Sequence, residues 1–565
     1  MKLDTIYDRI AAGPLAPVWI SLVPRETALE QVRRLENTAL PLYGLPFAIK
    51  DNIDLAGLPT TAGCPAYAYS PTQSAPVVER LMDAGAIPIG KTNMDQFATG
   101  LVGTRSPHGA CSSVFDPRYI SGGSSSGSAV AVASGLVSFA LGTDTAGSGR
   151  VPAAFNNLVG MKPTRGLLST SGVVPACRTL DCVTILTRTC QEAQVVFEAA
   201  CGFDPTDPFS RVPTPGQGAA PWATGPFRFG VPAAGQLQFF GDHQAAGLYQ
   251  KAIADLEAIG GEKVEIDYAL FRAAADLLYS GPWVAERLAA IGPFLEQHAG
   301  KMNPVVRDII LGARRFTAVD AFNAEYKLRE LRRATEAEWA RMDVLMLPTT
   351  GTIYTHQEVA ADPVRLNTNL GYYTNFVNLL DLAAVAVPAG FRPNGLPFGI
   401  SFIGPAFTDL GLLAVADRYE RHSTAGSAAC PPGCIAVAVL GAHLSGQPLN
   451  WQLAERGARL LKTCRTAPGY RFYAIEGAIA KPGLIRQDGF PGPGIEVEIW
   501  AVPEDRFGSF VDGVPPPLGI GNAVLDNGDT VKCFISEPYA IANALEITHF
   551  GGWRKYLSGQ LPQDQ

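Results

Sequence analysis

Histidine and cysteine are scarce in this sequence, with seven and ten residues among 565. Ten cysteines are too few for a disulfide-stapled scaffold, and we expect the thiols to be reduced. Cys430 and Cys434 have the spacing of half a zinc site, but no second pair of cysteines or histidines follows at zinc spacing. We therefore expect no metal site, and because no nucleotide-binding motif is present we expect no cofactor.

Long apolar runs are also missing, since no stretch of about 18 apolar residues occurs, and we expect no transmembrane helix. The opening residues MKLDTIYDRIAAG lack the apolar core of a signal peptide, so we expect a cytoplasmic protein. The formal net charge is −7 and no basic run is visible, which argues against nucleic acid or a membrane surface as a partner. Hydrophobic residues nevertheless make up 47% of the chain, enough for a large packed core.

Short apolar strands alternate with helical stretches over residues 1–421, which predicts an α/β catalytic domain. The charged segment Glu325–Arg341 predicts a solvated helix whose charges need no functional role. Ala129–Leu141, with the sequence AVAVASGLVSFAL, predicts a buried helix. The expected strands lie at 41–51, 86–93, 341–349 and 383–390, with a helix at 77–84.

A second domain is expected after residue 434. Segment 422–434 is rich in small residues and proline, which predicts a linker. Residues 435–565 then contain mostly short strand-like runs, and Asn527-Gly528 predicts a two-residue hairpin turn. We expect a small α+β domain with a curled sheet or barrel.

Two loops of small residues carry the strongest functional signal. Gly122–Ser128 (GGSSSGS) and Gly142–Arg150 (GTDTAGSGR) enclose the apolar segment. Such loops let backbone amides approach a ligand closely and stabilise a developing oxyanion. A flexible linker would not enclose an apolar helix, and the Gly-Lys-Ser/Thr element of a phosphate-binding loop is missing.

These loops resemble those of the amidase-signature family, over about residues 25–420. The resemblance implies a mixed central sheet flanked by helices and an amidohydrolase that forms an acyl-enzyme. It places the nucleophile at Ser148, the proton-shuttling serine at Ser124 and the basic lysine at Lys50 in GLPFAIKDNI. It also implies a cis peptide bond between Gly123 and Ser124.

The physical chemistry agrees with these roles. A serine hydroxyl is a weak nucleophile until a base removes its proton. No histidine lies in either loop, so a Ser-His-Asp triad has no obvious signal, whereas the apolar run LPFAI would bury Lys50 and lower its pKa. The expected oxyanion donors are the backbone N–H groups of Thr145, Ala146, Gly147 and Ser148.

Other charged residues near the loops have structural explanations. We expect Asp144 and Arg150 to form a buried ion pair that braces the second loop. Lys91 and Lys162 are also interpreted as structural.

The substrate is suggested by LLYSGPWVAERLAAI (277–291), which closely resembles a segment of allophanate hydrolases. The resemblance implies that Tyr279 and Arg287 hold the substrate, and Gly122 is a further expected contact. Eight residues make just over two helical turns, so one helix would present both side chains to one pocket. An arginine fork suits the carboxylate of allophanate.

The implied activity is hydrolysis of allophanate to ammonia and carbon dioxide in urea degradation, linked to a biotin-dependent urea carboxylase. Family habit implies a homodimer. Two alternatives remain open: a small-amide hydrolase of malonamate type, and an A-type amidotransferase subunit that delivers ammonia to a tRNA-bound acyl group. The acidic charge and the C-terminal extension argue against the second.

The extension itself resembles a γ-glutamyl cyclotransferase-like fold. Segment 438–450 resembles the substrate loop of that fold, but Leu440-Gly441 stands where the loop usually opens with tyrosine and glycine. His443 in this loop is a candidate general acid or base, or an anion contact. We expect this domain either to assist decarboxylation of the released N-carboxycarbamate or to support assembly.

Overall fold

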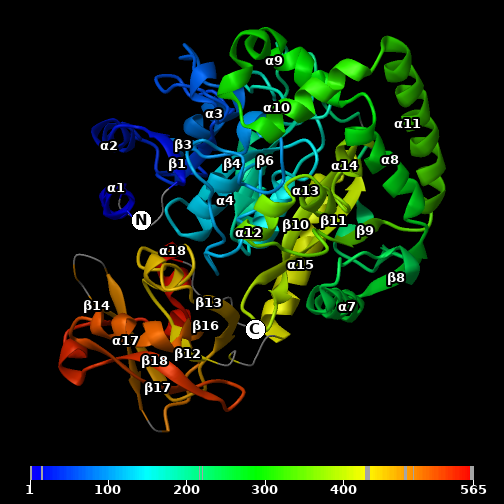
Figure 1. Cartoon of the computed structure of the whole chain (residues 1–565). Coiled ribbons are helices and arrows are strands. Elements are labelled where there is room, and N and C mark those ends of the chain that lie inside the picture. The colour runs from blue at the N-terminus through cyan, green and yellow to red at the C-terminus, as the bar shows by residue number, and fades with distance from the viewer. Residues whose placement is uncertain are drawn as a thin grey trace. The chain divides into compact units, whose positions relative to one another are not determined.

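The computed structural model describes residues 3–13, 17–214, 217–218, 220–426, 430, 433–475, 477, 480–487 and 489–559. The chain divides into two compact units (Figure 1): Ile6–Glu420 form the larger one, and the smaller one comprises Met1–Thr5 and the chain after Glu420. Within the described residues no helix is long and apolar enough to cross a membrane, and no group of three His, Cys, Asp or Glu could hold a metal ion.

An 11-stranded mixed sheet forms the centre of the larger unit, in the order β1-β3-β2-β4-β6-β5-β10-β11-β9-β7-β8. This confirms the α/β class and the mixed sheet. Parallel pairing joins β2 to β3 and β4, and β7 to β8 and β9; the other neighbours are antiparallel. The strands are β1 Trp19–Leu22, β2 Pro46–Lys50, β3 Ile87–Thr92, β4 Phe139–Asp144, β5 Val159–Lys162, β6 Cys182–Thr187, β7 Phe227–Pro232, β8 Gly261–Ile266, β9 Val344–Pro348, β10 Leu382–Phe391 and β11 Pro397–Pro405.

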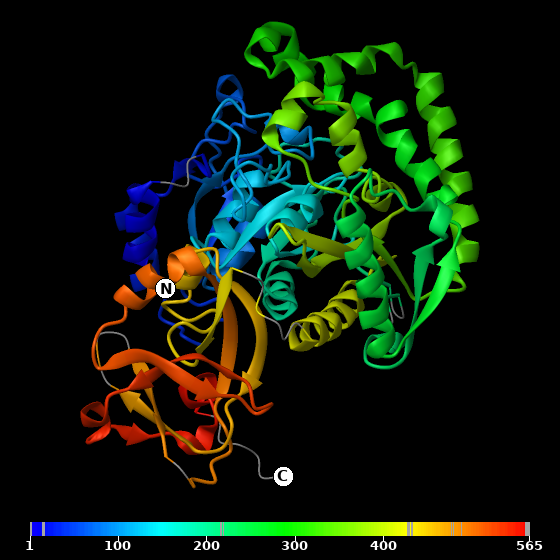
Figure 2. The same ribbon diagram turned by 60° about the horizontal axis from the view of Figure 1, so that its bottom comes forward.

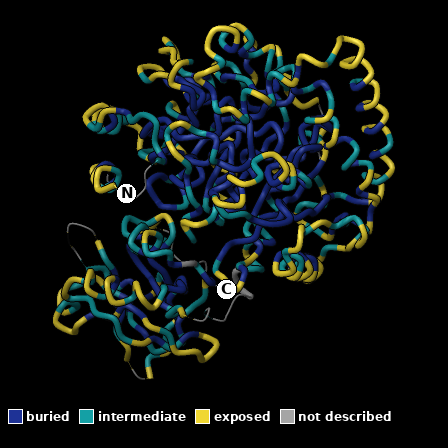
Figure 3. The backbone as a smooth tube through the Cα atoms, viewed as in Figure 1, coloured by how far each residue is buried: buried dark blue, intermediate teal, exposed yellow. Residues whose placement is uncertain are grey.

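Helices surround this sheet, and Figures 1 and 2 show α8 and α11 side by side at one edge of the larger unit. Figure 3 shows the buried backbone concentrated at the centre of this unit. The outer helix α11 carries the charged face that the sequence predicted. The helices are α1 Leu3–Ala12, α2 Arg25–Arg33, α3 Pro76–Asp83, α4 Ser126–Ala133, α5 Arg150–Phe155, α6 Cys190–Ala200, α7 His243–Ala258, α8 Ala269–Ser280, α9 Val284–His298, α10 Pro304–Leu311, α11 Ala318–Trp339, α12 His356–Ala361, α13 Arg365–Leu370, α14 Phe376–Leu379 and α15 Asp409–Gly426.

The segment Ala129–Leu141 is helical only in its first part, so the prediction of one buried helix is wrong for the rest. Helix α4 ends at Ala133, and Gly135 then adopts a positive φ of 68°, a common way to terminate a helix. The chain re-enters the sheet as β4, all of whose residues are buried. A short apolar run does not distinguish a buried helix from a buried strand.

The smaller unit contains a five-stranded sheet, β13-β16-β12-β18-β17, and a three-stranded sheet, β15-β14-β19. The described strands thus form two sheets. Buried apolar side chains from both sheets form a hydrophobic core of this unit's own. The elements are β12 Cys434–Val439, β13 Arg459–Arg465, β14 Tyr470–Ile475, β15 Lys481–Arg486, β16 Glu496–Pro503, β17 Leu518–Val524, β18 Thr530–Ser536, β19 Leu545–Glu546, α16 Trp451–Ala454, α17 Glu504–Asp512 and α18 Trp553–Ser558.

Two local predictions in this region need correction. Helix α15 continues to Gly426, so the expected linker at 422–434 begins as helix. The β17–β18 hairpin exists, but the Leu525 N–H donates to Asp529 O, which leaves three residues in the turn instead of two. Gly528 alone of these has a positive φ, as a three-residue hairpin loop requires.

Candidate active site

The three residues assigned to catalysis converge at the carboxyl ends of two parallel central strands. Lys50 is the last residue of β2, and Ser148 follows β4, which pairs in parallel with β2. Ser124 lies in the loop that opens α4. Parallel strands end at the same edge of a sheet, and this topology brings together residues that lie 74 and 98 positions apart. All three side chains are buried.

Lys50 lies in hydrogen-bond contact with Ser124, since 2.7 Å separate Nζ from Oγ. Thr143 on β4 presents two further oxygens to Nζ, its Oγ1 at 2.7 Å and its carbonyl at 3.5 Å. The Thr143 hydroxyl also accepts a hydrogen bond from Asn52. The amine is therefore held between Ser124 and the end of β4.

Burial lowers the pKa of Lys50 to about 7. Three buried carboxylates, those of Asp95, Asp144 and Asp181, oppose this effect by favouring the ammonium form, whereas Arg287 adds to it. A pKa near 7 gives a substantial fraction of neutral amine at neutral pH, which a general base requires.

Ser148 is turned toward the segment after β3, where its hydroxyl donates to the carbonyl of Gly100 at 3.3 Å. The hydroxyl makes this bond instead of one to Ser124. A backbone hydrogen bond links the two glycine loops, since the Ser125 N–H donates to Ser148 O at 3.2 Å. The Gly123–Ser124 peptide bond is cis, as the family resemblance implied.

The loop that carries Ser148 is held by a buried carboxylate. Asp144 accepts the N–H of Gly147 at 2.7 Å and pairs with Arg150, whose Nε lies 2.9 Å away. Burial would raise the pKa of Asp144, but Arg150 keeps it low. The predicted ion pair is therefore present and braces the loop.

This geometry divides the expected oxyanion donors. The Gly147 N–H is engaged by Asp144, so it is not free to bind an oxyanion in this arrangement. The N–H groups of Thr145, Ala146 and Ser148 make no hydrogen bond within the part of the chain that the structure describes. These three remain our predicted donors.

Tyr279 and Arg287 meet, but not on one helix. Tyr279 lies near the end of α8 and Arg287 in the second turn of α9, so the expectation of a single continuous helix is wrong. Gly281 and Pro282 separate the two helices. Arg287 is 3% exposed and donates to Thr99 Oγ1 at 2.8 Å and to Tyr279 Oη at 3.5 Å. The guanidinium is thus buried beside the segment that contacts Ser148.

The remaining sequence candidates lie in packed surroundings. Gly122 packs against Pro152 and Phe155, and no contact joins it to Tyr279 or Arg287 within the described residues. Lys91 donates to Thr60 Oγ1 at 2.9 Å and lies 3.6 Å from Asp51. The buried amine of Lys162 donates to Pro163 O. The two lysines are engaged in buried contacts, consistent with a structural role.

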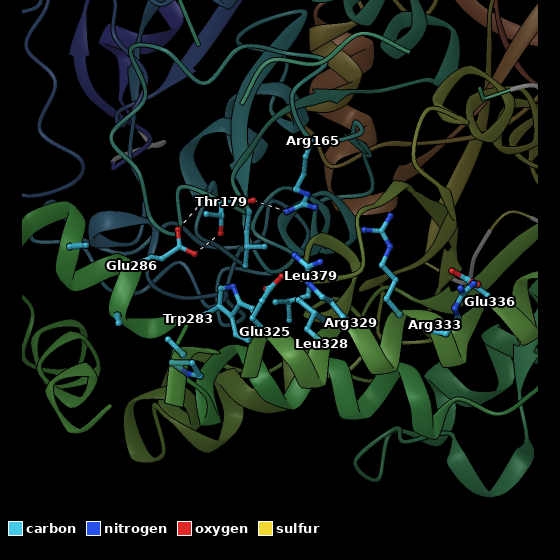
Figure 4. Close-up of a pocket in the computed structure, with 16 residues that line it drawn as sticks. Arg165, Thr179, Trp283, Glu286, Glu325, Leu328, Arg329, Arg333, Glu336 and Leu379 are labelled. Atoms are coloured by element: carbon cyan, nitrogen blue, oxygen red, sulfur yellow. Dashed lines mark hydrogen bonds and ion pairs between the residues drawn. The ribbon is translucent and has the colours of Figure 1, made fainter. Parts of the chain in front are cut away.

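A cavity of about 920 Å³ lies between α9 and α11, and neither catalytic serine nor Lys50 lines it (Figure 4). Glu286 on α9 accepts hydrogen bonds from Thr179 on one side, and arginines of α11 lie on the other. The next residues along the chain from two lining residues have other partners. Arg287, after Glu286, donates to Thr99, and Asp181, after Leu180, accepts a hydrogen bond from Thr145 in the second glycine loop.

His443 lines a separate cavity of about 170 Å³ in the smaller unit. Its Nε2 lies 2.8 Å from Gln452 Oε1, and its ring stacks on Phe534 at 4.8 Å. Burial lowers the pKa of His443 to about 4, so the imidazole is neutral near pH 7. Lys481 also lines this cavity.

Sequence reasoning missed Thr143, Gly100 and Asp95 as parts of the site. Thr143 belongs to the GTD triplet, and its position next to a buried aspartate was the available signal. Gly100 and Asp95 lie in IGKTNMDQFATG, a segment that yielded no candidate site residue from the sequence. Their contribution depends on contacts between distant strands that a single sequence does not specify.

Comparison with known proteins identifies the family of this chain. The chain matches the family model described as "Amidase" over residues 5–413 and "Allophanate hydrolase C-terminal domain" over 435–558. It is 44% identical to the urea amidolyase of Saccharomyces cerevisiae, an alignment that covers 98% of this chain and 32% of that protein. The chain thus spans about a third of the length of such urea amidolyases.

Two other similarities extend the comparison. The solved allophanate hydrolase of Kluyveromyces lactis is 42% identical, with a TM-score of 0.72 and coverage of 99% of this chain and 96% of that one. The A subunit of glutamyl-tRNA(Gln) amidotransferase from Geobacillus stearothermophilus is 35% identical over 69% of this chain and 86% of its own. The chain therefore belongs to the amidase family and carries the C-terminal domain named for allophanate hydrolases.

Proposed function

We propose that this chain is an allophanate hydrolase, which converts allophanate to ammonia and carbon dioxide through a Ser148 acyl-enzyme. The proposal rests on the buried Lys50, which has a pKa of about 7 and contacts Ser124, together with the buried Arg287. Arg287 donates to Thr99, the neighbour of the Gly100 carbonyl that holds the Ser148 hydroxyl. The full-length similarity to a protein named allophanate hydrolase supports the choice of substrate.

The first chemical step activates Ser148. Neutral Lys50 has two N–H groups and one lone pair. Thr143 supplies two oxygens for the N–H groups, which leaves the lone pair for the Ser124 hydroxyl. Rotation of the Ser148 hydroxyl away from Gly100 brings it to Ser124, which takes its proton as it passes its own to Lys50.

Attack on the terminal amide carbon then forms a tetrahedral oxyanion. The N–H groups of Thr145, Ala146 and Ser148 are the donors for this charge. Collapse breaks the C–N bond, and the proton held by Lys50 leaves with ammonia through Ser124. Water attacks the remaining ester of Ser148, and the product is N-carboxycarbamate.

Substrate orientation falls to Arg287 and Tyr279. Allophanate carries a carboxylate at the end opposite its scissile amide, and a buried guanidinium binds such a group strongly. Thr99 and Ala98 hold Arg287 next to Gly100, the residue that contacts Ser148. A substrate anchored at its anionic end would present its amide to Ser148.

The smaller unit has a proposed role in the second half of the reaction. We retain the likeness to a γ-glutamyl cyclotransferase-like fold with a curled sheet as a proposal, and we place decarboxylation of N-carboxycarbamate at His443. A neutral imidazole in this small cavity can accept a proton or a hydrogen bond, and Lys481, which lines the same cavity, can bind an anion. Replacing His443 by Ala in the full chain should leave allophanate consumption intact and slow release of the second ammonia. Equal yields and rates would leave this unit a role in assembly alone.

The cellular setting is also proposed. A functional link to a biotin-dependent urea carboxylase accords with the similarity to urea amidolyases, of which this chain spans about a third. We further propose a cytoplasmic homodimer.

One alternative substrate class keeps the same mechanism. A malonamate-type amide also carries a carboxylate near its amide, and Arg287 would hold it equally. Rates on allophanate, malonamate and acetamide, each measured with the Ser148→Ala variant as blank, test the proposal. The highest kcat/KM on allophanate supports it, and a higher value on malonamate overturns the substrate while retaining the nucleophile.

A further inference from the structure

Asp95 contacts the backbone beside Ser124 and has no role in the steps described above. It follows β3 in the segment IGKTNMDQFATG, and its side chain is fully buried. The carboxylate accepts the N–H of Gly103 at Oδ2, 2.9 Å away, and the N–H of Arg105 at Oδ1, 2.8 Å away. Both oxygens are therefore fixed by backbone donors.

Two glycines pack directly on this carboxylate. A Cβ at Gly100 would lie 2.7 Å from Oδ2, and a Cβ at Gly123 would collide with the same oxygen. Gly100 supplies the carbonyl that holds the Ser148 hydroxyl, and Gly123 precedes Ser124. The Asp95 N–H also donates to Ser124 O at 3.2 Å. Asp95 thus contacts two backbone segments: the one around Gly100, which holds the Ser148 hydroxyl, and the loop that carries Ser124.

The charge of Asp95 also affects the pKa of Lys50. The charged groups that shift the pKa of Lys50 are Asp95, Asp144 and Asp181, which favour the ammonium, and Arg287, which disfavours it. Of the three carboxylates, Asp95 raises the pKa of Lys50 the most. Burial raises the pKa of Asp95, and Arg105, whose side chain is 3% exposed, opposes this rise together with the N–H groups of Gly103 and Arg105.

We propose that Asp95 is a positioning residue of the Ser-Ser-Lys centre: it fixes the Ser124 loop and the Gly100 segment that holds the Ser148 hydroxyl, and it places a buried carboxylate near Lys50. This inference rests on the proposed function, since it assigns to Asp95 the tuning of the base in that reaction. The role is not catalytic, because backbone N–H groups engage both carboxylate oxygens and the Ser148 hydroxyl bonds to Gly100 O instead.

The charge of Asp95 predicts the direction in which the pH dependence should shift. Asp95→Asn removes a negative charge that stabilises the Lys50 ammonium, so the lysine should lose its proton at lower pH. The acid limb of kcat/KM should then move to lower pH by about one unit, the scale of shift that a nearby charge produces. A purely structural residue would lower the rate without moving the limb.

Asp51→Asn is the matched control. Asp51 is also fully buried and also accepts two backbone N–H groups, from Thr61 and Gly63, but its charged partner is Lys91 instead of Lys50. This variant should lower thermal stability as Asp95→Asn does and leave the acid limb in place. Thermal melts of both variants establish that they fold.

The test is the pH dependence of ammonia release from allophanate by the full chain and both variants. A limb displaced downward in Asp95→Asn alone supports the inference; an unmoved or upward-moving limb overturns it. If Asp95→Asn does not fold, Arg105→Gln replaces it. Arg105 holds the pKa of Asp95 down, so without this cation Asp95 is less ionised and the limb should again move to lower pH; an unmoved or upward-moving limb overturns the inference. Absence of ammonia release by the unmodified chain would instead contradict the proposed function.

Discussion

At the scale of single residues, Lys50 decides whether the site can work. A lysine in water is almost wholly protonated at pH 7 and cannot act as a base. Burial at the end of β2 removes that obstacle, and the contacts of Thr143 and Ser124 orient the amine. The apolar run before Lys50 was enough to predict its burial, but the part played by Thr143 emerged only from the structure.

The pH dependence of activity follows from this residue. The pKa of Lys50 is lowered to about 7, and the neutral amine, present above that pH, is the active form. We expect kcat/KM for allophanate to fall about tenfold per pH unit below pH 6 and to level off above pH 8. A pH series with enzyme stability checked at each point measures this. A profile that is flat between pH 5 and 8 would argue against Lys50 as the base.

At the scale of elements, the second glycine loop depends on one ion pair. Asp144 and Arg150 are both fully buried, and Asp144 also fixes the Gly147 N–H. Their six-residue separation within GTDTAGSGR allowed the pair to be predicted. The bend between α8 and α9 could not be predicted in the same way, because the helical spacing of Tyr279 and Arg287 concealed the turn at Gly281.

Removal of one partner of this pair should destabilise the larger unit. Arg150→Met leaves the Asp144 charge buried and uncompensated, which typically costs about 3–5 kcal/mol. Arg333→Met is the control, because its pair with Glu336 on α11 is exposed and its loss should change little. Chemical denaturation measures both variants. Similar stabilities for the two would contradict a bracing role for Asp144 and Arg150.

Substrate anchoring also belongs to this scale, since it needs two helices. Arg287→Gln removes a buried cation from α9 while Tyr279 on α8 remains. We expect kcat/KM for allophanate to fall roughly 10- to 100-fold, as for loss of a charged hydrogen bond. Acetamide, which has no carboxylate, provides the comparison. An equal loss on both amides would show that Arg287 supports the loops instead of the anion.

At the scale of the whole molecule, the sequence predicted more of the architecture than of the chemistry inside it. The strands near 46–50 and 87–92 and the charged outer helix were foreseen because hydrophobic periodicity reports burial, whereas the mixed sheet was implied by the family resemblance. The helix-to-strand change within Ala129–Leu141 was not, since both forms there are buried. Asp95 likewise gains its meaning only from the strands and loops that surround it.

The most direct test of the account is ammonia release from freshly prepared allophanate by the purified chain and by its Ser148→Ala variant. We predict steady release by the unmodified chain and loss of that release in the variant, with the fold of the variant confirmed by its melting curve. Undiminished release by Ser148→Ala would contradict the assigned nucleophile. No release by the unmodified chain, with cleavage of another small amide that requires Ser148, would contradict the substrate.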